Sequence, residues 1–252
     1  HSYSSAASDV YKRQGIGSAA VLQMDMKAAA SIVKRENTRV SKLIGINRAA
    51  RTTCVKPAGT TSLVLGTSSG IHAWHNDYYI RRLRVGKNEA IYRYLSNNHP
   101  ELIEDEYFRP HDTAVIEIPQ SAPKGSILRT ESAFDLLKRV KKVATEWVKP
   151  GHRKGSNTHN VSATISLKAE DWDKAGKWMW DNRDCYNGLS VLPYDGGTYT
   201  QAPFEDITKT EFNKRVKSLN HINLSNIVET TDETDLSGEL ACAGGSCEIT
   251  GL

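Results

Sequence analysis

Strand-like and helix-like patterns of apolar residues alternate along this chain, and that alternation restricts its fold more than any other feature. Alternating or continuous apolar patterns predict short strands at 52–55, 78–85, 113–118, 160–167 and 188–192. Apolar residues at helical spacing predict helices at 24–43, 88–98, 134–148 and 172–179. Strands that alternate with helices favour an α/β protein with a mostly parallel sheet or a barrel.

Hydropathy excludes a membrane-spanning chain and argues against a secreted one. No apolar run reaches the roughly 18 residues that a membrane helix needs. The first residues also lack the apolar core of a signal peptide, so the sequence predicts a cytoplasmic protein. The chain has 4 cysteines, too few for a disulfide scaffold, so each is weighed as a packing, ligand or redox group.

Charge divides the chain into a basic body and an acidic end. The whole chain has 33 Lys and Arg against 29 Asp and Glu, whereas residues 229–252 contain six acids and no base. Residues 1–228 therefore carry a formal charge of +10. Such an excess favours an anionic ligand, either a nucleotide or a nucleic acid, and a solvated basic surface is the alternative.

Both ends of the chain lack the periodicity of its middle. Residues 1–14, which begin at His1, have no apolar pattern and are expected to be a non-native leader, so the chain reads as a fragment or a processed piece. Residues 229–252 are acidic and aperiodic, and are expected to form a flexible tail. The folded part is thus predicted to span 15–228.

A turn of small residues follows the strand predicted at 52–55 and opens an apolar helix. Small side chains leave backbone N–H groups unshielded at a helix N-terminus, where a phosphate is favoured. Lys56 could add a point charge, although the Gly-Lys-Ser/Thr ending of a Walker loop is missing. A plain capped turn remains the alternative. The candidate phosphate-binding residues are Pro57, Ala58, Gly59, Thr60, Thr61 and Ser62.

The remaining chemistry-bearing residues are cysteines and histidines. Cys242 and Cys247 flank a Gly-containing segment near the chain end, which indicates thiol–disulfide exchange unless the pair is coincidental. Cys54 and Cys185 adjoin strands and are expected to be packing residues. His72 and His75 have metal-ligand spacing but no third ligand, so they are interpreted as loop residues and no metal site is predicted.

Together these segments resemble the large catalytic subunit of ribonucleotide reductases, and most closely its adenosylcobalamin-dependent class II triphosphate reductases. The resemblance runs from about Gly15 to the chain end. The motifs that carry it are RTTCVKPAGTTS (51–62), GIH (70–72), YIRR (79–82), NVS (160–162), YNGLSVLP (186–193), TYTQAP (198–203) and CAGGSC (242–247).

The resemblance implies that 15–228 is the C-terminal part of a ten-stranded α/β barrel. It implies that the loop 57–62 holds substrate phosphates, and that Cys242 and Cys247 form a redox-active pair that re-reduces an internal disulfide and is itself reduced by thioredoxin or a similar dithiol protein. The reaction implied is reduction of ribonucleoside triphosphates to deoxyribonucleotides, with adenosylcobalamin as cofactor, although no contacting residue is assigned. A dNTP effector would bind a part outside this chain, and no membrane or nucleic-acid partner is expected.

One departure from the family pattern matters for activity. The Asn-x-Cys-x-Glu motif that carries the radical cysteine is missing from this sequence, so the chain alone is expected to be inactive. Two alternatives remain. One is a diphosphate reductase that pairs with a separate radical-generating subunit. The other is a nucleic-acid-binding module that uses Arg81, Arg82, Arg84, Lys138, Arg139, Lys141 and Lys142.

Overall fold

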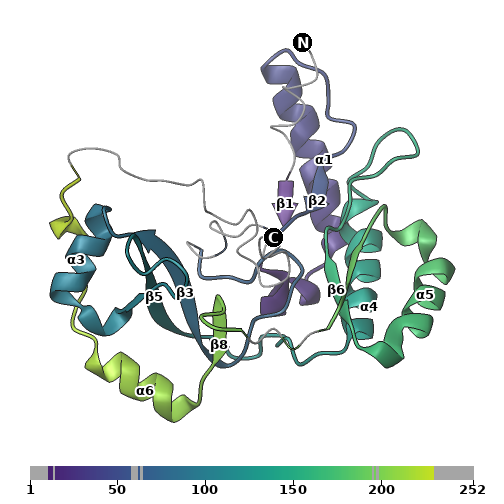
Figure 1. Ribbon diagram of the computed structural model, residues 1–252. Coiled ribbons are helices and arrows are strands. Elements are labelled where there is room, and N and C mark those ends of the chain that lie inside the picture. The colour runs from purple at the N-terminus through teal and green to yellow at the C-terminus, as the bar shows by residue number, and fades with distance from the viewer. Residues whose placement is uncertain are drawn as a thin grey trace. The chain divides into compact units, whose positions relative to one another are not determined.

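The computed structural model describes residues 11–13, 15–57, 62, 65–194, 196 and 199–229, with only the backbone of 11–13. The chain divides into two compact units (Figure 1). The first unit comprises His1–Trp74 and Lys124–Tyr194, and the second comprises His75–Pro123 and Asp195–Leu252. Each unit has its own elements and is described separately.

The described part of the first unit contains the α-helices α1 (Met26–Leu43), α4 (Ala133–Val143) and α5 (Trp172–Asp181). A π-helical turn, Ala144–Val148, extends α4. Side chains cap two of the N-termini, because Asp25 accepts a hydrogen bond from Ala28 N at 2.9 Å and Ser132 accepts one from Asp135 N at 3.2 Å. The predicted helices at 24–43 and 134–148 are thereby confirmed to within two residues.

The strands of the first unit form two short parallel ladders. Strand β1 (Tyr11–Arg13) pairs with β2 (Thr53–Val55), and β6 (Thr164–Leu167) pairs with β7 (Ser190–Pro193). A parallel bridge between Val55 and Val161 continues the pairing of β2 toward the segment that precedes β6. The parallel direction agrees with the sequence prediction. The continuous apolar run at 188–192 favours a buried strand, but β7 leaves three of its four residues exposed.

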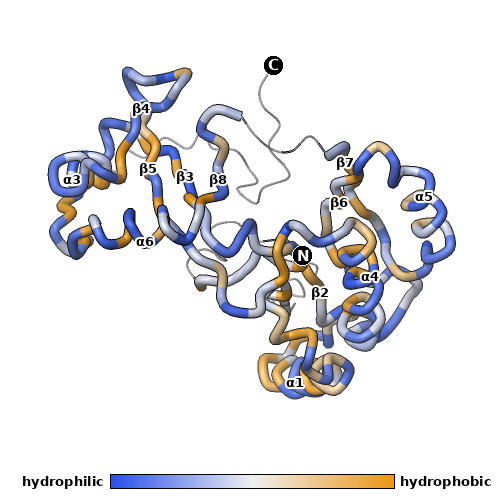
Figure 2. Tube along the Cα trace, turned by 90° about the horizontal axis from the view of Figure 1, so that it is seen from below, coloured by the Kyte–Doolittle hydropathy of each residue, from blue (hydrophilic) through white to orange (hydrophobic). Residues whose placement is uncertain are grey.

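The core of the first unit lies around α4 and the two ladders. Figure 2 shows hydrophobic and hydrophilic residues sharing the circumference of α1 and of α4, as expected for helices with one buried face. The residues of this core that are almost fully buried include Ile16, Met26, Val55, Ile71, Leu137, Val140, Val143, Ile165 and Leu167.

The second unit is built on a four-stranded antiparallel sheet in the order β4-β5-β3-β8. Its strands are β3 (Tyr78–Gly86), β4 (Ile103–Asp105), β5 (Thr113–Ser121) and β8 (Phe204–Asp206). Its helices are α3 (Ala90–Asn98) and α6 (Lys209–Ser218). Residues of α3, including Leu95, pack against sheet residues such as Val85 and Ile116 to form a separate core.

This sheet corrects the prediction of a mostly parallel sheet. Strand β3 pairs antiparallel with both β5 and β8, and it contains three arginines, whereas buried parallel strands are apolar throughout. Within the described ranges the strands do not close into a ten-stranded barrel. Strands β4 and β8 were missed because three residues are too few to show a period.

The chain leaves the first unit after Trp74 and re-enters it at Lys124. Trp74 forms a parallel bridge with Leu128, its N–H donates to Ile127 O at 2.8 Å, and its carbonyl accepts from Arg129 N at 2.9 Å. Within the second unit, Ala122 N donates to Asp77 O at 3.0 Å. The segment 75–123 is therefore an insertion whose two ends are each fixed by backbone pairing.

None of the helices in the described part of the chain combines the length and the apolar character needed to cross a bilayer.

Candidate functional site

Three of the resemblance motifs converge beside strand β2 in the first unit. Val55 N donates to Asn160 O at 3.3 Å, and Ser162 N donates to Val55 O at 2.9 Å. The motif 160–162 therefore lies directly against the strand that leads into the candidate phosphate loop. The motif 186–193 lies next to it, because Ser190 N donates to Ala163 O at 3.1 Å.

The structure describes both ends of the candidate phosphate loop. Pro57 is half-buried, and Gly70 approaches it so closely that a Cβ on Gly70 would lie 3.0 Å from Pro57 N. At the other end Ser62 is 4 % exposed, and its carbonyl accepts from Thr67 N at 2.9 Å. The four residues between them, Ala58, Gly59, Thr60 and Thr61, lie outside the described residues. The motif 70–72 thus supports the loop at its first residue.

His72 joins this motif to strand β6. Its Nδ1 atom lies 3.2 Å from Ser69 O and its Nε2 atom accepts a hydrogen bond from Thr164 N at 3.0 Å. A ring that donates through Nδ1 and accepts through Nε2 is neutral, and burial lowers its pKa, with Arg139 acting in the same direction. The sequence interpretation of His72 as a plain loop residue was therefore incomplete, since the ring is a structural cross-link.

The lowered pKa of His72 predicts that the first unit loses stability as the pH falls below about 6.5. In that range the unfolded chain binds a proton that the folded ring excludes, so the free energy of unfolding decreases until the folded pKa is passed. Urea unfolding at intervals between pH 5 and pH 7.5, followed by tryptophan fluorescence, measures this slope. The His72→Gln variant should show a shallower slope over the same interval, and an unchanged slope would contradict the assignment.

Two asparagines connect the motifs 160–162 and 186–193. Asn160 Nδ2 donates to Gly188 O at 2.8 Å, and Asn160 Oδ1 accepts from Asn187 N at 3.3 Å. Asn187 Nδ2 in turn donates to Thr158 O at 2.6 Å. The two side chains satisfy backbone groups of a loop that has no regular ladder there. The sequence analysis did not find this bridge, and the only signal was an Asn in each motif.

A buried ion pair fixes the backbone of Ile71, in the centre of the motif 70–72. Arg139 Nε donates to Ile71 O at 3.2 Å, while its two terminal nitrogens donate to the carboxylate of Glu131 at 2.5 and 2.6 Å. The side chains of Arg139 and Glu131 are 6 % and 13 % exposed. The guanidinium therefore holds this motif from the α4 side.

Gly17 predicts how sensitive this region is to added volume. A Cβ at Gly17 would lie 2.2 Å from His72 O, so Gly17→Ala must displace the backbone of the motif 70–72. We expect a loss of about 1–3 kcal/mol in the free energy of unfolding, as for overpacking in a core. Gly176→Ala, within α5 and with open space around its Cβ, is the matched control and should gain about 0.5–1 kcal/mol. Equal effects of both changes in chemical denaturation would refute the close approach.

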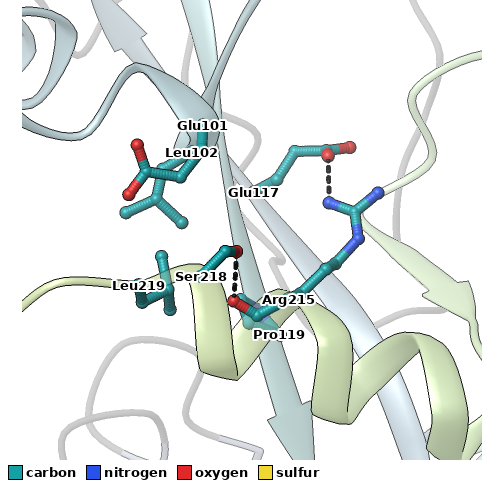
Figure 3. Close-up of a pocket in the computed structure, with 7 residues that line it drawn as sticks. All are labelled: Glu101, Leu102, Glu117, Pro119, Arg215, Ser218 and Leu219. Atoms are coloured by element: carbon teal, nitrogen blue, oxygen red, sulfur yellow. Dashed lines mark hydrogen bonds and ion pairs between the residues drawn. The ribbon is translucent and has the colours of Figure 1, made fainter.

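The motifs 79–82 and 198–203 meet in the second unit. Arg82 N donates to Pro203 O at 2.8 Å and Arg82 donates to Ala202 O at 3.2 Å. The Arg82 guanidinium also pairs with Glu117 at 2.6 Å, and Glu117 accepts from Arg215 of α6 at 2.9 Å. Figure 3 shows this carboxylate and Arg215 at a small pocket, whose cavity volume is about 20 Å³. Burial raises the pKa of the neighbouring Tyr79 to about 12, so its phenol stays protonated.

The arginines of the nucleic-acid alternative are internal groups. Arg81 and Arg139 are 2 % and 7 % exposed, and Arg82 is engaged by Glu117 and Glu205. On α4, Lys138 and Lys142 lie 3.4 and 2.7 Å from Asp135 and Glu146. Arg81, Arg82 and Arg139 are thus engaged within the protein, whereas Lys138, Lys141 and Lys142 remain exposed on α4.

The cysteine predictions have different outcomes. Cys54 and Cys185 were expected to be packing residues, but both are only half-buried. Cys242 and Cys247 lie outside the described residues. In the described part of the chain, His, Cys, Asp and Glu side chains do not gather in threes at a spacing that could hold a metal ion.

Comparison with known proteins gives one consistent group of relatives, although no family model matches the chain. Curated relatives are adenosylcobalamin-dependent ribonucleoside-triphosphate reductases. The reductase of Lactobacillus delbrueckii subsp. bulgaricus is 26 % identical over 217 residues, 83 % of this chain and 28 % of that protein. The one from Euglena gracilis is 28 % identical over 213 residues, 80 % of this chain and 27 % of that protein.

A solved structure agrees with these relatives. The crystal structure of a B-12 dependent (class II) ribonucleotide reductase matches with a TM-score of 0.64 and 25 % identity, covering 76 % of this chain and 26 % of that one. The chain thus spans little more than a quarter of the length of the proteins it matches. Over most of its length this chain is therefore similar to the adenosylcobalamin-dependent, class II ribonucleoside-triphosphate reductases, the family that the motifs of its sequence resemble.

Proposed function

We propose that this chain is part of an adenosylcobalamin-dependent reductase that converts ribonucleoside triphosphates to 2′-deoxyribonucleotides. The observation that carries the proposal is similarity over 83 % of the chain to proteins with that activity. The names of these relatives favour a triphosphate over a diphosphate substrate. The chain would contribute the loop 57–62 and the cysteine pair at 242 and 247.

The phosphate role of the loop rests on backbone chemistry. Residues 58–61 are Ala-Gly-Thr-Thr, whose small side chains allow close approach to N–H groups, and three hydroxyls at 60–62 could add donors. The described anchors support this role, because Gly70 packs on Pro57 and Ser62 is buried. A loop held at both ends can present its amides without a large ordering cost when the phosphates bind.

The tail role rests on electron balance. Removing the 2′-hydroxyl as water consumes two electrons and two protons, which a dithiol supplies as it becomes a disulfide. We place that first dithiol inside the reductase, where it is left as an internal disulfide after each turnover. In the next step the Cys242–Cys247 dithiol reduces this internal disulfide by thiol–disulfide exchange and becomes a disulfide itself. A thioredoxin-like dithiol protein then restores the pair. Two cysteines separated by Ala-Gly-Gly-Ser can form a disulfide that closes a small ring. The acidic terminal segment that contains them would move this pair between the internal disulfide and the external reductant.

Adenosylcobalamin, when bound, would supply the radical that starts the reaction. The pocket at Glu117 does not fit this group, because its cavity volume is about 20 Å³, whereas pockets for drug-sized molecules measure about 300–1,000 Å³. We therefore assign the cofactor to the whole reductase and no contact to a residue of this chain.

The test is reduction of CTP by a full-length reductase that carries this chain. We expect dCTP to form only when adenosylcobalamin and a dithiol reductant are both present, and CTP to be preferred to CDP. Turnover without adenosylcobalamin, or a strong preference for CDP, would contradict the triphosphate class II assignment. The thermal stability of the protein, measured beforehand, ensures that an inactive sample is folded.

A further inference from the structure

In the described part of the chain, a cluster of cations without carboxylate partners lies at the start of strand β2, away from the candidate phosphate loop at its other end. Two stretches of the sequence, 37–76 and 147–169, contain no Asp or Glu. The fold pairs these two stretches with each other. Thr52 N donates to Gly151 O at 3.0 Å, and Arg153 N donates to Ala50 O at 2.9 Å. The pairing therefore brings cations together in two segments that have no acidic residue of their own.

Four cations form this basic cluster, which we define as Lys34, Arg48, Arg51 and Arg153. Arg51 pairs with His152 in an antiparallel bridge, so their side chains belong to directly opposed positions. Lys34 Nζ donates to His152 O at 3.2 Å, and Arg153 donates to Thr38 Oγ1 at 2.9 Å. Within the described ranges none of the four cations has a carboxylate partner, in contrast to Arg82 and Arg139.

Two buried nitrogen atoms at the cluster have no hydrogen-bond partner among the described residues. Arg153 Nε and the neighbouring His152 Nδ1 are buried, and no described group forms a hydrogen bond with either. A buried guanidinium N–H without an acceptor is costly, and an anion would satisfy it. Burial and the charge of Arg48 both lower the pKa of Arg153. Cations held close together without a counter-ion repel one another, and a bound anion would offset this repulsion.

We propose that the basic cluster is a second anion site, which binds the phosphate groups of a small phosphorylated molecule. Guanidinium forks suit phosphate oxygens, and Lys34 would add a point charge. Pro57 lies six positions after Arg51 across strand β2, which corresponds to about 20 Å in extended chain. The cluster and the loop 57–62 are thus distinct sites. The inference does not depend on the reductase proposal.

The experiment titrates the 252-residue chain with inorganic tripolyphosphate in a calorimeter at low salt. We expect saturable binding that Arg48→Gln weakens by roughly tenfold, the value of one charge-assisted hydrogen bond. Arg48 is exposed and forms no described hydrogen bond, so this change should not disturb folding. Lys174→Gln, which removes an equally exposed cation from α5, is the matched control and should bind as the unaltered chain does.

His159 supplies a local readout. Its Nδ1 atom lies 3.2 Å from Thr53 O, and burial, Arg51 and His152 all lower its pKa. Tripolyphosphate bound at the cluster should raise this pKa, measured from the imidazole resonance by NMR. The Thr60→Val/Thr61→Val double variant should leave that response unchanged while it weakens nucleotide binding at the loop. The failure of one proposal can thereby be told from the failure of the other.

Three results would overturn the proposal. The first is the absence of saturable binding, and the second is an equal loss of affinity in Lys174→Gln and Arg48→Gln. The third is much tighter binding of a single-stranded 12-nucleotide DNA than of tripolyphosphate, with the same dependence on Arg48, because this would make the cluster part of a nucleic-acid surface.

Discussion

Replacing Cys242 with serine in a full-length reductase that carries this chain should abolish turnover driven by thioredoxin. The remaining thiol of Cys247 has no second tail thiol with which to form a disulfide, so it cannot supply two electrons. The relay therefore stops after the first turnover. Cys247→Ser should have the same effect. We expect a loss of at least about 100-fold in the steady-state rate of dCTP formation, since only direct reduction of the internal disulfide by a bulky protein would remain.

A small dithiol separates this relay from a structural role of the cysteines. Dithiothreitol can reach a disulfide that thioredoxin cannot, so both serine variants should retain most of the activity that dithiothreitol supports. Ser246→Ala, which alters the same segment without removing a thiol, is the matched control and should leave both activities intact. If both reductants lose activity equally in the cysteine variants, the pair has no relay function.

The second large effect is expected in folding, from Arg139→Met in α4. This change leaves the carboxylate of Glu131, which is 13 % exposed, without its partner and removes the donor to Ile71 O. Breaking a buried ion pair from one side typically costs about 3–5 kcal/mol. The free energy of unfolding, measured by urea denaturation at pH 7.5, should decrease by that amount. Because Ile71 lies in the motif beside Pro57, substrate affinity in a full-length reductase should decrease as well.

Lys138→Met is the matched control, one residue away on the same helix. Its side chain is 71 % exposed and its ammonium lies 3.4 Å from Asp135, and exposed pairs of this kind contribute about 0–1 kcal/mol. The double variant Glu131→Met/Arg139→Met removes both charges and should recover most of the loss, since apolar replacements of a whole buried pair are often neutral. A double variant no more stable than Arg139→Met would show that the cost lies in packing volume rather than in the unpaired carboxylate.

How far the sequence predicts this structure depends on the length of each pattern. The apolar residues of α1 and of α4 with its π-helical turn repeat over several turns, so both helices could be located to within two residues. Phe204–Asp206 is only three residues long and pairs with a strand more than a hundred residues earlier in the chain. Nothing local in such a segment indicates its partner. The three arginines of β3 argued against a buried parallel strand, and this signal was missed.

The site shows the same division between local and distant information. The loop 57–62 could be proposed from its own small residues, and strand β2 before it was placed correctly. The roles of His72, Asn160 and Arg139 could not be predicted, because each depends on a backbone group brought close only by folding. Arg139 shows the limit clearly, because a charged residue on an amphipathic helix is ordinarily exposed, and only Glu131 and Ile71 O make its burial favourable.

The paired ends of the segment 75–123 also bear on how this chain tolerates rearrangement. Backbone hydrogen bonds join Trp74 to Ile127 and Arg129, and join Asp77 to Ala122. The two ends of the segment are therefore each held by backbone pairing. Length changes at a surface turn inside such a segment need not move its fixed ends. The exposed turn around Arg109 and Pro110, between β4 and β5, is the natural place for a new pair of termini. A circular permutant opened there should keep both hydrophobic cores, and a genetically encoded reporter inserted there should leave the residues around strand β2 in place.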